Sequence, residues 1–584
     1  MPPSRLRIFA LGASLALAVG ACSSSKKAAD TTAAAAADTT AGADTTAPSA
    51  DTTAAAAAAT DTTAATADTT AGADTTAAAS AAATAAAGDT LVIDKSFDLK
   101  TVDPGRTFEI TGNMLVRAMY ENLVTFENND VSTPKAELAD SFTANADATE
   151  FTFKLRDGVK FGDGSALDSA DVVFSLQRVQ NLKGNGSFLV DGLTFAAPDP
   201  LTVVIKSAKP NAALTRILAS PTLAVVNADV VKAAGGSDAV GADQSDKAEG
   251  ALNKASAGTG PYVLDSFSLS DQTVITANPN YKGKNTAKYK KIVFRNADAA
   301  TQALNLQSGQ SDIALDLGGD QLSQLKSATG VNIDKVSSPN VWFLFTNADP
   351  KISAIASKPE YRDAVRYGLD YTALLDLVGE GGSQAAGLIP SQFLGALKAD
   401  AAIKRDVARA KAAYAKCACP GSVKLEYPSD FAANGLNFGP VAERIKANLE
   451  EVGLKVELVP SPIQAALANY RAGKEEMGLW LWGPDYPDPN DYLVFGPGGL
   501  VGKRAGWNTG ADPAIEAVVT EVTPVSDDAK RIELFTKFQT MMNEKGPFMQ
   551  IFQPTAVVAS GAKVEPVKFH PTLQIDPLLV TPKV

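Results

Sequence analysis

The stretch that most constrains the fold of this chain runs from Gly478 to Tyr492 and reads GLWLWGPDYPDPNDY. An apolar segment rich in aromatic residues stops at Gly483-Pro484, and acids alternating with prolines follow it. Each proline fixes its own φ and pushes the preceding residue out of the helical region, so this loop is stiff. The pattern therefore predicts a buried strand that delivers Trp482 and Asp485 to a rigid loop at its end.

This stretch has two interpretations. A carboxylate held beside indole rings on rigid backbone suits the capture of a cationic or amine-bearing ligand by ion pairing and stacking. The alternative is a strand end followed by an acidic loop that faces water, and the spacing alone does not separate the two. Trp480 lies two residues before Trp482, so both side chains point to the same side of the strand, which is either core or cleft.

Size and charge narrow the classes of function. With 584 residues, 45% of them hydrophobic, the chain can bury more than one core. The formal net charge of −12 argues against nucleic acid as a partner, because no basic stretch could neutralise phosphates.

Metal and redox chemistry have few candidate residues. His570 is the only histidine, which excludes a multi-histidine metal site and leaves any histidine-dependent catalysis to one residue. Cys417 and Cys419 form a Cys-x-Cys pair, too short for a relaxed disulfide or a four-ligand zinc site; a strained local disulfide is the alternative. We expect no cofactor and no metal site.

The first residues are expected to be an export signal. Arg5 and Arg7 flank the start of an apolar run that ends in small residues directly before Cys22. The run is too short for a comfortable transmembrane helix. Its ending resembles the bacterial lipobox, which implies cleavage after residue 21 and lipidation of Cys22. The alternative is an ordinary secretory peptide.

A tether is expected over residues 22–88. The segment repeats Asp-Thr-Thr-Ala with runs of alanine and contains no aromatic and no large aliphatic residue. No apolar burial could therefore offset the entropy of folding. A coil of this length spans about 40–50 Å on average, which suits a spacer that lifts a domain off a membrane.

From Thr90 onwards the patterns are those of a folded α/β protein. Residues 151–155 alternate apolar and polar side chains, as a half-buried strand does, and Asp157-Gly158 predicts a hairpin turn into a return strand at 159–161. Asp168 opens an amphipathic helix. Further on, predicted strands and helices alternate: strands near 292–295, 311–315, 423–427 and 454–459, helices at 301–309 and 438–451, and buried strands at 341–347 and 547–552. This alternation predicts an α/β sheet.

Three motifs resemble one known family. They are FTFKLRDGVKFGDG at 151–164, GTGPY at 258–262 and WGPDYPDP at 482–489. Their sequences and order resemble the bacterial extracellular solute-binding proteins of family 5, the dipeptide- and oligopeptide-binding lipoproteins of ABC importers. The resemblance covers about 90–584.

The resemblance implies an α/β fold of the periplasmic-binding-protein type (type II, large class), in which two crossing strands join two lobes and a subdomain is inserted in the first. The expected boundaries are 89–125, 258–340 and 548–584 for lobe one, 126–257 for the insert, and 341–547 for lobe two. Ligand would bind between the lobes, and closure at the hinge would bury it.

The resemblance also implies roles for site residues. Asp485 would pair with the α-amino group of a peptide, and Trp482 would wall the pocket. Tyr486, Asp488 and Asp491 are expected to be loop structure. Additional candidate ligand-binding residues have aromatic or cationic side chains: Trp480, Trp342, Trp507 and Arg504.

The function implied is that of a lipid-anchored, monomeric binding protein, not an enzyme, that delivers peptides to an ABC permease from the outer face of the membrane. A sugar or a metal chelate in place of the peptide is an alternative, although His570 is expected to lie outside the pocket-forming segments. Two other classes stay open: a surface receptor on a stalk, and a hydrolase that uses Asp485 with Asp488 or Asp491 as a carboxylate pair.

Overall fold

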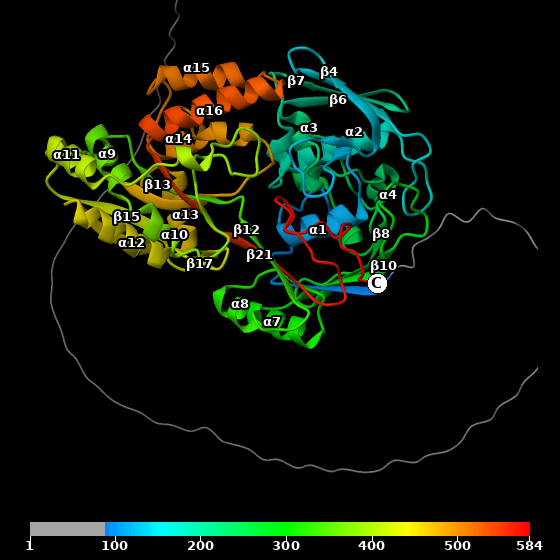
Figure 1. Cartoon of the computed structure of the whole chain (residues 1–584). Coiled ribbons are helices and arrows are strands. Elements are labelled where there is room, and N and C mark those ends of the chain that lie inside the picture. Colours follow the sequence, from blue (N-terminus) through cyan, green and yellow to red (C-terminus); the bar gives the residue numbers. More distant parts are fainter. Residues whose placement is uncertain (1–87, 584) are drawn as a thin grey trace, which may run out of the picture. The chain divides into compact units, whose positions relative to one another are not determined.

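Two large sheets, each covered by helices on both faces, organise the protein, and a smaller third sheet lies beside the first (Figure 1). The structure is a computed structural model that describes residues 88–583. The predicted signal peptide (1–21), the predicted lipidation residue Cys22 and the predicted tether up to residue 87 lie outside this range. No helix in 88–583 is both long enough and apolar enough to cross a membrane.

The first lobe is built on a seven-stranded mixed sheet. Its strands, in spatial order, are β12 (Asn332–Ser337), β21 (Thr555–Ser560), β11 (Ile313–Ala314), β1 (Gly88–Lys95), β10 (Tyr289–Asn296), β9 (Gln272–Ala277) and β8 (Tyr262–Ser266). Helix α1 (Ile110–Met119) packs on one face, and helices α7 (Ala299–Ser308) and α8 (Gly319–Leu325) pack on the other.

Alternation along single strands separates these two cores. In β11, Ile313 belongs to the core under α1, and its neighbour Ala314 to the core under α7 and α8. In β21, Val558 and Ala559 divide in the same way. Successive side chains of a strand point to opposite faces, so a strand covered on both sides is apolar throughout.

The inserted region carries a four-stranded antiparallel sheet in the order β4 (Ala139–Ala144), β5 (Glu150–Leu155), β7 (Thr202–Ser207) and β6 (Leu193–Asp199). Helix α2 (Ser169–Leu182) begins where the sequence predicts it. The Asp168 side chain accepts the N–H groups of Ala170 and Asp171, and the Asp171 carboxylate accepts the N–H of Asp168, which completes a capping box. Short elements complete the region: β3 (Lys135–Ala136), which pairs with β2 (Val124–Thr125) just before the insert, η1 (Ser187–Val190), α3 (Leu214–Ile217), η2 (Pro221–Leu223), α4 (Ala228–Ala233), α5 (Ala242–Ser245) and α6 (Glu249–Leu252).

The second lobe is built on a six-stranded sheet in the order β14 (Ser383–Gln384), β20 (Phe548–Gln553), β13 (Val341–Thr346), β19 (Met477–Trp482), β15 (Ser422–Pro428) and β18 (Lys455–Ser461). Its helices are α9 (Pro359–Gly368), α10 (Tyr371–Leu375), η3 (Ala399–Ala401), α11 (Val407–Cys417), α12 (Phe438–Glu451), α13 (Ile463–Arg471), η4 (Pro489–Phe495), α14 (Leu500–Arg504), α15 (Pro513–Val522) and α16 (Asp528–Lys545). A two-stranded hairpin, β16 (Ala432–Ala433) and β17 (Leu436–Asn437), precedes α12.

Strand β13 is buried along its whole length because helices cover both faces of its sheet. Trp342 and Leu344 belong to the core under α9 to α12, whereas Phe343 and Phe345 belong to the core under α14 to α16. The predicted buried strand at 341–347 is confirmed.

Two connections cross between the lobes, one from β12 to β13 and one from β20 to β21. They run side by side: the Ser338 N–H donates to the carbonyl of Pro554 at 2.7 Å, and the Gln553 side-chain amide donates to the carbonyl of Ser338 at 2.7 Å. The expected α/β fold with two crossing strands is confirmed by these pairings.

Two sequence predictions about strand pairing are wrong. Residues 159–161 are not a return strand of β5, because both edges of β5 are taken by β4 and β7; Lys160 instead makes an isolated bridge with Ala166. The sequence predicts that lobe one resumes at residue 548, but β20 pairs with β13 and β14 in the second lobe. Strand partners lie far apart in the sequence, so local patterns do not identify them.

A disulfide joins Cys417 and Cys419 across two positions of the chain, with their Cα atoms 5.2 Å apart. Cys417 is the last residue of α11, and both side chains are buried in the core of the second lobe. The local disulfide that the sequence analysis left as the alternative is therefore the one present.

The GTGPY motif has a steric role. A Cβ atom on Gly258 or on Gly260 would overlap the backbone at Met119, where α1 ends. The Gly260 N–H donates to the Met119 carbonyl at 3.0 Å, so the two segments touch backbone to backbone. Glycine is the residue that permits such an approach.

We expect Gly260→Ala to lower the free energy of unfolding by at least about 1–3 kcal/mol, because the added methyl group meets backbone that cannot rotate away. Thermal or urea unfolding followed by circular dichroism measures this change. Gly250→Ala is the matched control, since nothing lies within 4 Å of a Cβ there. Equal stability of both variants would contradict the steric role.

Candidate ligand-binding site

The loop after β19 runs directly past the first crossing connection. β19 ends at Trp482, as predicted, and a Cβ on Gly483 would lie 2.6 Å from the side-chain oxygen of Asn340, which belongs to that connection. Asn340 in turn donates to Asn434 of the β16–β17 hairpin at 2.9 Å. Glycine at 483 thus allows the loop to lie against the point where the lobes meet.

Asp488 anchors the loop. Its carboxylate is fully buried and caps η4 by accepting the N–H of Asn490 at 2.8 Å. It also pairs with Arg531 of α16 and, at 3.4 Å, with Arg216 of α3 in the inserted region. One carboxylate therefore connects the loop to both sides of the interlobe boundary.

Asp491 holds the strand end in place. It is buried, and its Oδ2 accepts the Trp482 indole N–H at 3.2 Å and the Asp485 backbone N–H at 3.1 Å. Burial and the nearby Asp485 carboxylate raise the pKa of Asp491 well above its usual range. Tyr486 packs against the core of the inserted region. Tyr486, Asp488 and Asp491 are therefore structural parts of the loop, as expected.

Asp485 differs from these two neighbours because, among the described residues, its carboxylate has neither an ion-pair partner, as Asp488 has, nor a hydrogen bond, as Asp491 has. Burial alone raises the pKa of Asp485 from 3.8 to about 6. A partly desolvated carboxylate without a counter-charge is an electrostatic site for a cation.

Asp485 faces a cavity of about 270 Å³ between the lobes. Residues from α1, the inserted region, the first crossing connection, the β16–β17 hairpin, the loop after β19 and the C-terminal segment line it: Phe108, Ile110, Asn113, Phe126, Ala219, Ser220, Pro221, Ser338, Pro339, Asn340, Asn434, Gly483, Pro484, Asp485, Tyr486, Pro487, Phe569, Pro571, Thr572 and Gln574. Among these residues Asp485 is the sole aspartate or glutamate, and none is lysine, arginine or histidine.

Two neutral acceptors share this cavity. The side-chain oxygens of Asn113 and Gln574 are buried and have no hydrogen-bond partner within residues 88–583. An unmade hydrogen bond at a buried acceptor is costly, so these oxygens favour a ligand that brings N–H or O–H donors.

Trp482 supports the site from behind and does not line the cavity. Its ring meets that of Phe495 edge to face at 5.5 Å, and its N–H holds Asp491. The predicted role of Trp482 as a pocket wall is thus replaced by a positioning role through Asp491.

Trp480 lies in the core of the second lobe, which was one of its two expected places. Its ring stacks on Tyr470 at 4.6 Å, and its N–H donates to Glu475 at 2.8 Å. Burial raises the pKa of Glu475 to about 9.

The other three candidates also lie away from the cavity. Trp342 is fully buried and stacks on Phe438 at 4.2 Å. Trp507 is buried and lines a separate hollow beside α9. The Arg504 guanidinium lies over the Tyr470 ring at 4.8 Å. None of the three lines the interlobe cavity in this structure.

The C-terminal segment contributes residues that the sequence analysis missed. Phe569, Pro571, Thr572 and Gln574 line the cavity, although the segment around His570 was expected to lie outside it. His570 itself is buried, its Nδ1 accepts the Thr572 N–H at 3.3 Å, and burial lowers its pKa to about 4. No local motif marks this segment, because it reaches the cavity only through the return of the chain along β21.

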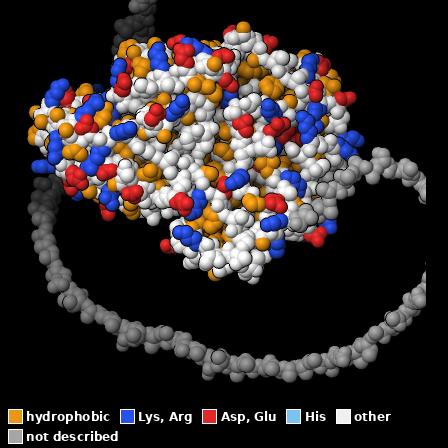
Figure 2. Space-filling model, in the orientation of Figure 1, with side chains coloured by type: hydrophobic (Ala, Val, Ile, Leu, Met, Phe, Trp, Pro, Cys, Tyr) orange, Lys and Arg blue, Asp and Glu red, His pale blue; other side chains and the backbone are white. Residues whose placement is uncertain are grey.

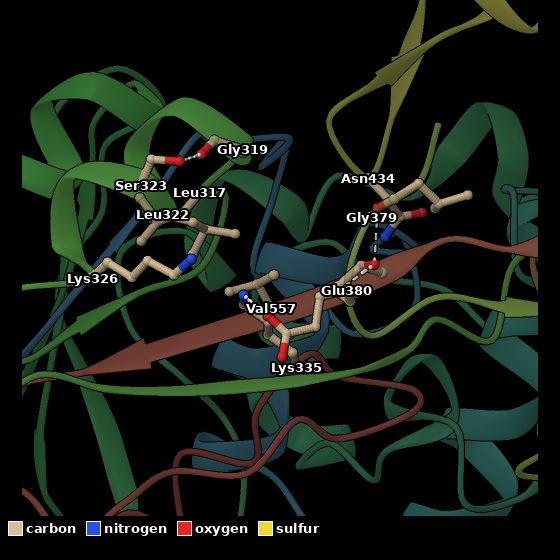
Figure 3. A pocket seen from close by; sticks show the side chains of 13 residues that line it. Leu317, Gly319, Leu322, Ser323, Lys326, Lys335, Gly379, Glu380, Asn434 and Val557 are labelled. Atoms are coloured by element: carbon tan, nitrogen blue, oxygen red, sulfur yellow. Dashed lines mark hydrogen bonds and ion pairs between the residues drawn. The ribbon is translucent and has the colours of Figure 1, made fainter. Parts of the chain in front are cut away.

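A second hollow, of about 180 Å³, lies on the other side of the β16–β17 hairpin (Figure 3). It is bounded by α8, by β12 and β21, and by the turn at Gly379, and Lys335 pairs with Glu380 inside it at 2.9 Å. Asn434 lines both hollows. In this second hollow Lys335 and Glu380 pair with each other, whereas the Asp485 carboxylate has no ion-pair partner among the described residues.

On the face drawn in Figure 2, acidic and basic side chains are interspersed, and no large area carries charge of one sign. Within residues 88–583, no group of three or more His, Cys, Asp or Glu side chains could hold a metal ion. The interlobe cavity with Asp485 is therefore the candidate site.

Comparison with known proteins agrees with this geometry. Residues 133–497 match the model of the bacterial extracellular solute-binding proteins, family 5. The chain is 27% identical over 499 residues to the probable D,D-dipeptide-binding periplasmic protein DdpA of Escherichia coli K12, covering 83% of this chain and 92% of that protein.

Two solved structures share the fold. The periplasmic binding protein DppA from Helicobacter pylori in complex with the peptide STSA matches with a TM-score of 0.67 and 20% identity, over 85% of this chain and 99% of that one. The binding protein AgaA from A. tumefaciens R10 in complex with agropinic acid matches with a TM-score of 0.66 and 24% identity, over 85% and 98%. The chain belongs to the family 5 bacterial extracellular solute-binding proteins, which are binding proteins of ABC transporters and not enzymes.

Proposed function

We propose that this protein captures short peptides by their α-amino group in the interlobe cavity and delivers them to an ABC permease. The observation that carries the proposal is the Asp485 carboxylate, which is partly buried in that cavity and has no cationic partner among the described residues. The relatives named above that bind dipeptides or peptides support the same class of solute.

An ammonium group would satisfy Asp485 in two ways. It would supply the missing counter-charge and donate up to three hydrogen bonds. Such a pair is stronger than one on the surface because solvent screens it less. Asp485 is thus proposed as the amine anchor, with Trp482 acting through Asp491 to position it.

Closure of the lobes is part of the proposal. We propose lobe one at 89–125, 258–340 and 554–584, the insert at 126–257 and lobe two at 341–553, with the boundary moved so that β20 stays with its sheet. A ligand that contacts both lobes shifts the population towards the closed form. The permease would recognise and bind the closed form.

Anchoring at the membrane completes the proposed role. Lipidation of Cys22 would hold a monomer at the outer face of the cell membrane, and residues 22–87 would be the tether. Acyl chains contribute about 0.8 kcal/mol for each buried methylene, so several chains on one cysteine anchor a protein durably.

A non-peptide solute is the second candidate. AgaA, which shares the fold, is described in complex with agropinic acid. Native mass spectrometry of the purified protein, followed by release and identification of bound molecules, separates the two candidates. Short peptides would support the proposal, and a sugar or a chelate would overturn the peptide assignment while leaving the transport role.

Asp485→Asn is expected to weaken binding of a free-amine dipeptide by at least about tenfold, because the amide keeps the shape but loses the charge that pairs with the ammonium. Isothermal titration calorimetry at pH 7.5 measures the dissociation constant. Asp191→Asn removes the same charge from an exposed residue and is expected to leave affinity unchanged. Equal affinities of the Asp485→Asn variant and the wild type would refute the anchor.

The same variant should not be less stable than the wild type, which separates lost binding from lost folding. The folded-state pKa of Asp485, about 6, lies above its ordinary 3.8, so the stability that this group contributes falls as pH rises from about 4 to 6. The melting temperature of Asp485→Asn should therefore match the wild type near pH 4 and exceed it above pH 6.

Peptide affinity is expected to depend on pH with an inflection near 6. Below that value Asp485 must lose a proton before it can pair with an ammonium, so the dissociation constant should rise by about tenfold for each further pH unit. Calorimetry between pH 4.5 and 7.5 tests this. A flat profile in the wild type, or an unchanged profile in Asp485→Asn, would contradict it.

Arg216→Met is expected to favour the open form of the unliganded protein. Arg216 lies in the inserted region and pairs with Asp488 at 3.4 Å and with Asp528 at 3.3 Å, both in the second lobe. The radius of gyration from small-angle scattering should increase, and peptide should restore the compact value. Lys290→Met, which breaks an exposed pair inside the first lobe, is the control and should change nothing.

A further inference from the structure

The cavity is one-sided in charge. Its lining offers the Asp485 carboxylate together with the unpartnered oxygens of Asn113 and Gln574, and within residues 88–583 no lysine, arginine or histidine side chain lines it. All three groups attract hydrogen-bond donors or cations. A peptide has an ammonium at one end and a carboxylate at the other, and this lining offers no cationic side chain to the carboxylate.

The two arginines next to the loop after β19 are already paired with carboxylates of the protein. Arg531 and Arg216 both pair with Asp488, and Arg216 also pairs with Asp528. Neither guanidinium is among the lining residues. A ligand carboxylate could recruit them only by breaking buried ion pairs, which is strongly unfavourable.

The hollow on the far side of Phe126 does contain cations, but most are paired as well. Arg117 lies between Glu137 at 2.6 Å and Asp576 at 3.1 Å, and Arg156 pairs with Glu121 at 3.3 Å. Phe126 lines both hollows and stands between them. Lys284, which lines the far hollow, is exposed at its edge.

The length of the bound peptide determines where its carboxylate lies. A dipeptide spans only about 7 Å when extended, so a dipeptide held by its ammonium at Asp485 keeps its carboxylate inside the cavity. There the carboxylate would be desolvated, would face Asp485, and would have no cationic partner. A neutral amide at the same position carries no charge and adds N–H donors for the two free oxygens.

We propose that this site selects short peptides and related amines whose carboxyl end is blocked as an amide, over the corresponding free acids. This inference rests on the proposed amine anchor. It states that the cavity recognises the amino end and the N–H donors of its ligand and does not recognise a carboxylate.

The test is a pair of dipeptides that differ only at the carboxyl end, Ala-Phe and Ala-Phe amide, titrated into the full protein by calorimetry at pH 7.5. We expect the amide to bind at least about tenfold more tightly, which is one unit in the logarithm of the dissociation constant. A smaller ratio overturns the inference. A tetrapeptide pair should show a smaller ratio, because the longer chain allows its carboxylate to lie outside the cavity.

A charge placed in the cavity should reverse the preference. Asn113→Lys adds a cation to the lining, so the free acid should become the tighter ligand. Asn508→Lys makes the same change at an exposed residue beside Trp507 and should keep the preference for the amide. An unchanged preference in Asn113→Lys would also overturn the inference.

The outcomes distinguish this inference from the function on which it rests. If neither dipeptide binds, the amine anchor fails. If both bind and Asp485→Asn weakens both, but the free acid binds as tightly as the amide, the anchor stands and only the preference for blocked ends fails.

Discussion

The pairing of Asp488 with two arginines is the interaction on which the site depends. The carboxylate is fully buried and connects the loop after β19 to α16 on one side and to α3 of the inserted region on the other. Removing a partner from such a buried pair leaves an uncompensated charge, so the arrangement tolerates little change. Because Asp488 occupies both guanidinium groups, Asp485 three residues earlier is left without a counter-charge.

Three aspartates in seven residues therefore have three different roles. Asp488 fixes the loop, Asp491 fixes the Trp482 side chain and the Asp485 backbone, and Asp485 alone faces the cavity. Burial of an unpaired carboxylate is unfavourable in the free protein, and a cationic ligand relieves it. The proline-rich loop is stiff, and the bond from the Asp485 backbone N–H to Asp491 holds this residue beside the cavity.

Local structure was predictable from the sequence where the signal was local. The alternation at 151–155, the Asp168 cap and the apolar run at 341–347 each appear as expected, because period and capping are properties of neighbouring residues. The return strand at 159–161 failed for the opposite reason: whether β5 had a free edge depended on β7, some fifty residues away. The tryptophans on strands were ambiguous for a similar reason, since an aromatic residue on a strand suits a core and a cleft wall equally; Trp342 and Trp480 both lie in cores.

Asp485 lines the interlobe cavity whereas the tryptophans do not, and the difference has a physical reason. A buried tryptophan is satisfied by any apolar neighbour, so its identity says little about which face of the sheet it serves. A carboxylate within an apolar and proline-rich segment must be paired, protonated or exposed to a ligand, and the surrounding residues supply the evidence for which. Asp488 is paired, the buried Asp491 accepts two N–H groups, and Asp485 faces the cavity. What the sequence could not supply was the rest of the lining, such as Asn113 of α1 and Gln574 of the C-terminal segment, which lie far from Asp485 in the sequence and meet at the cavity only in the folded chain.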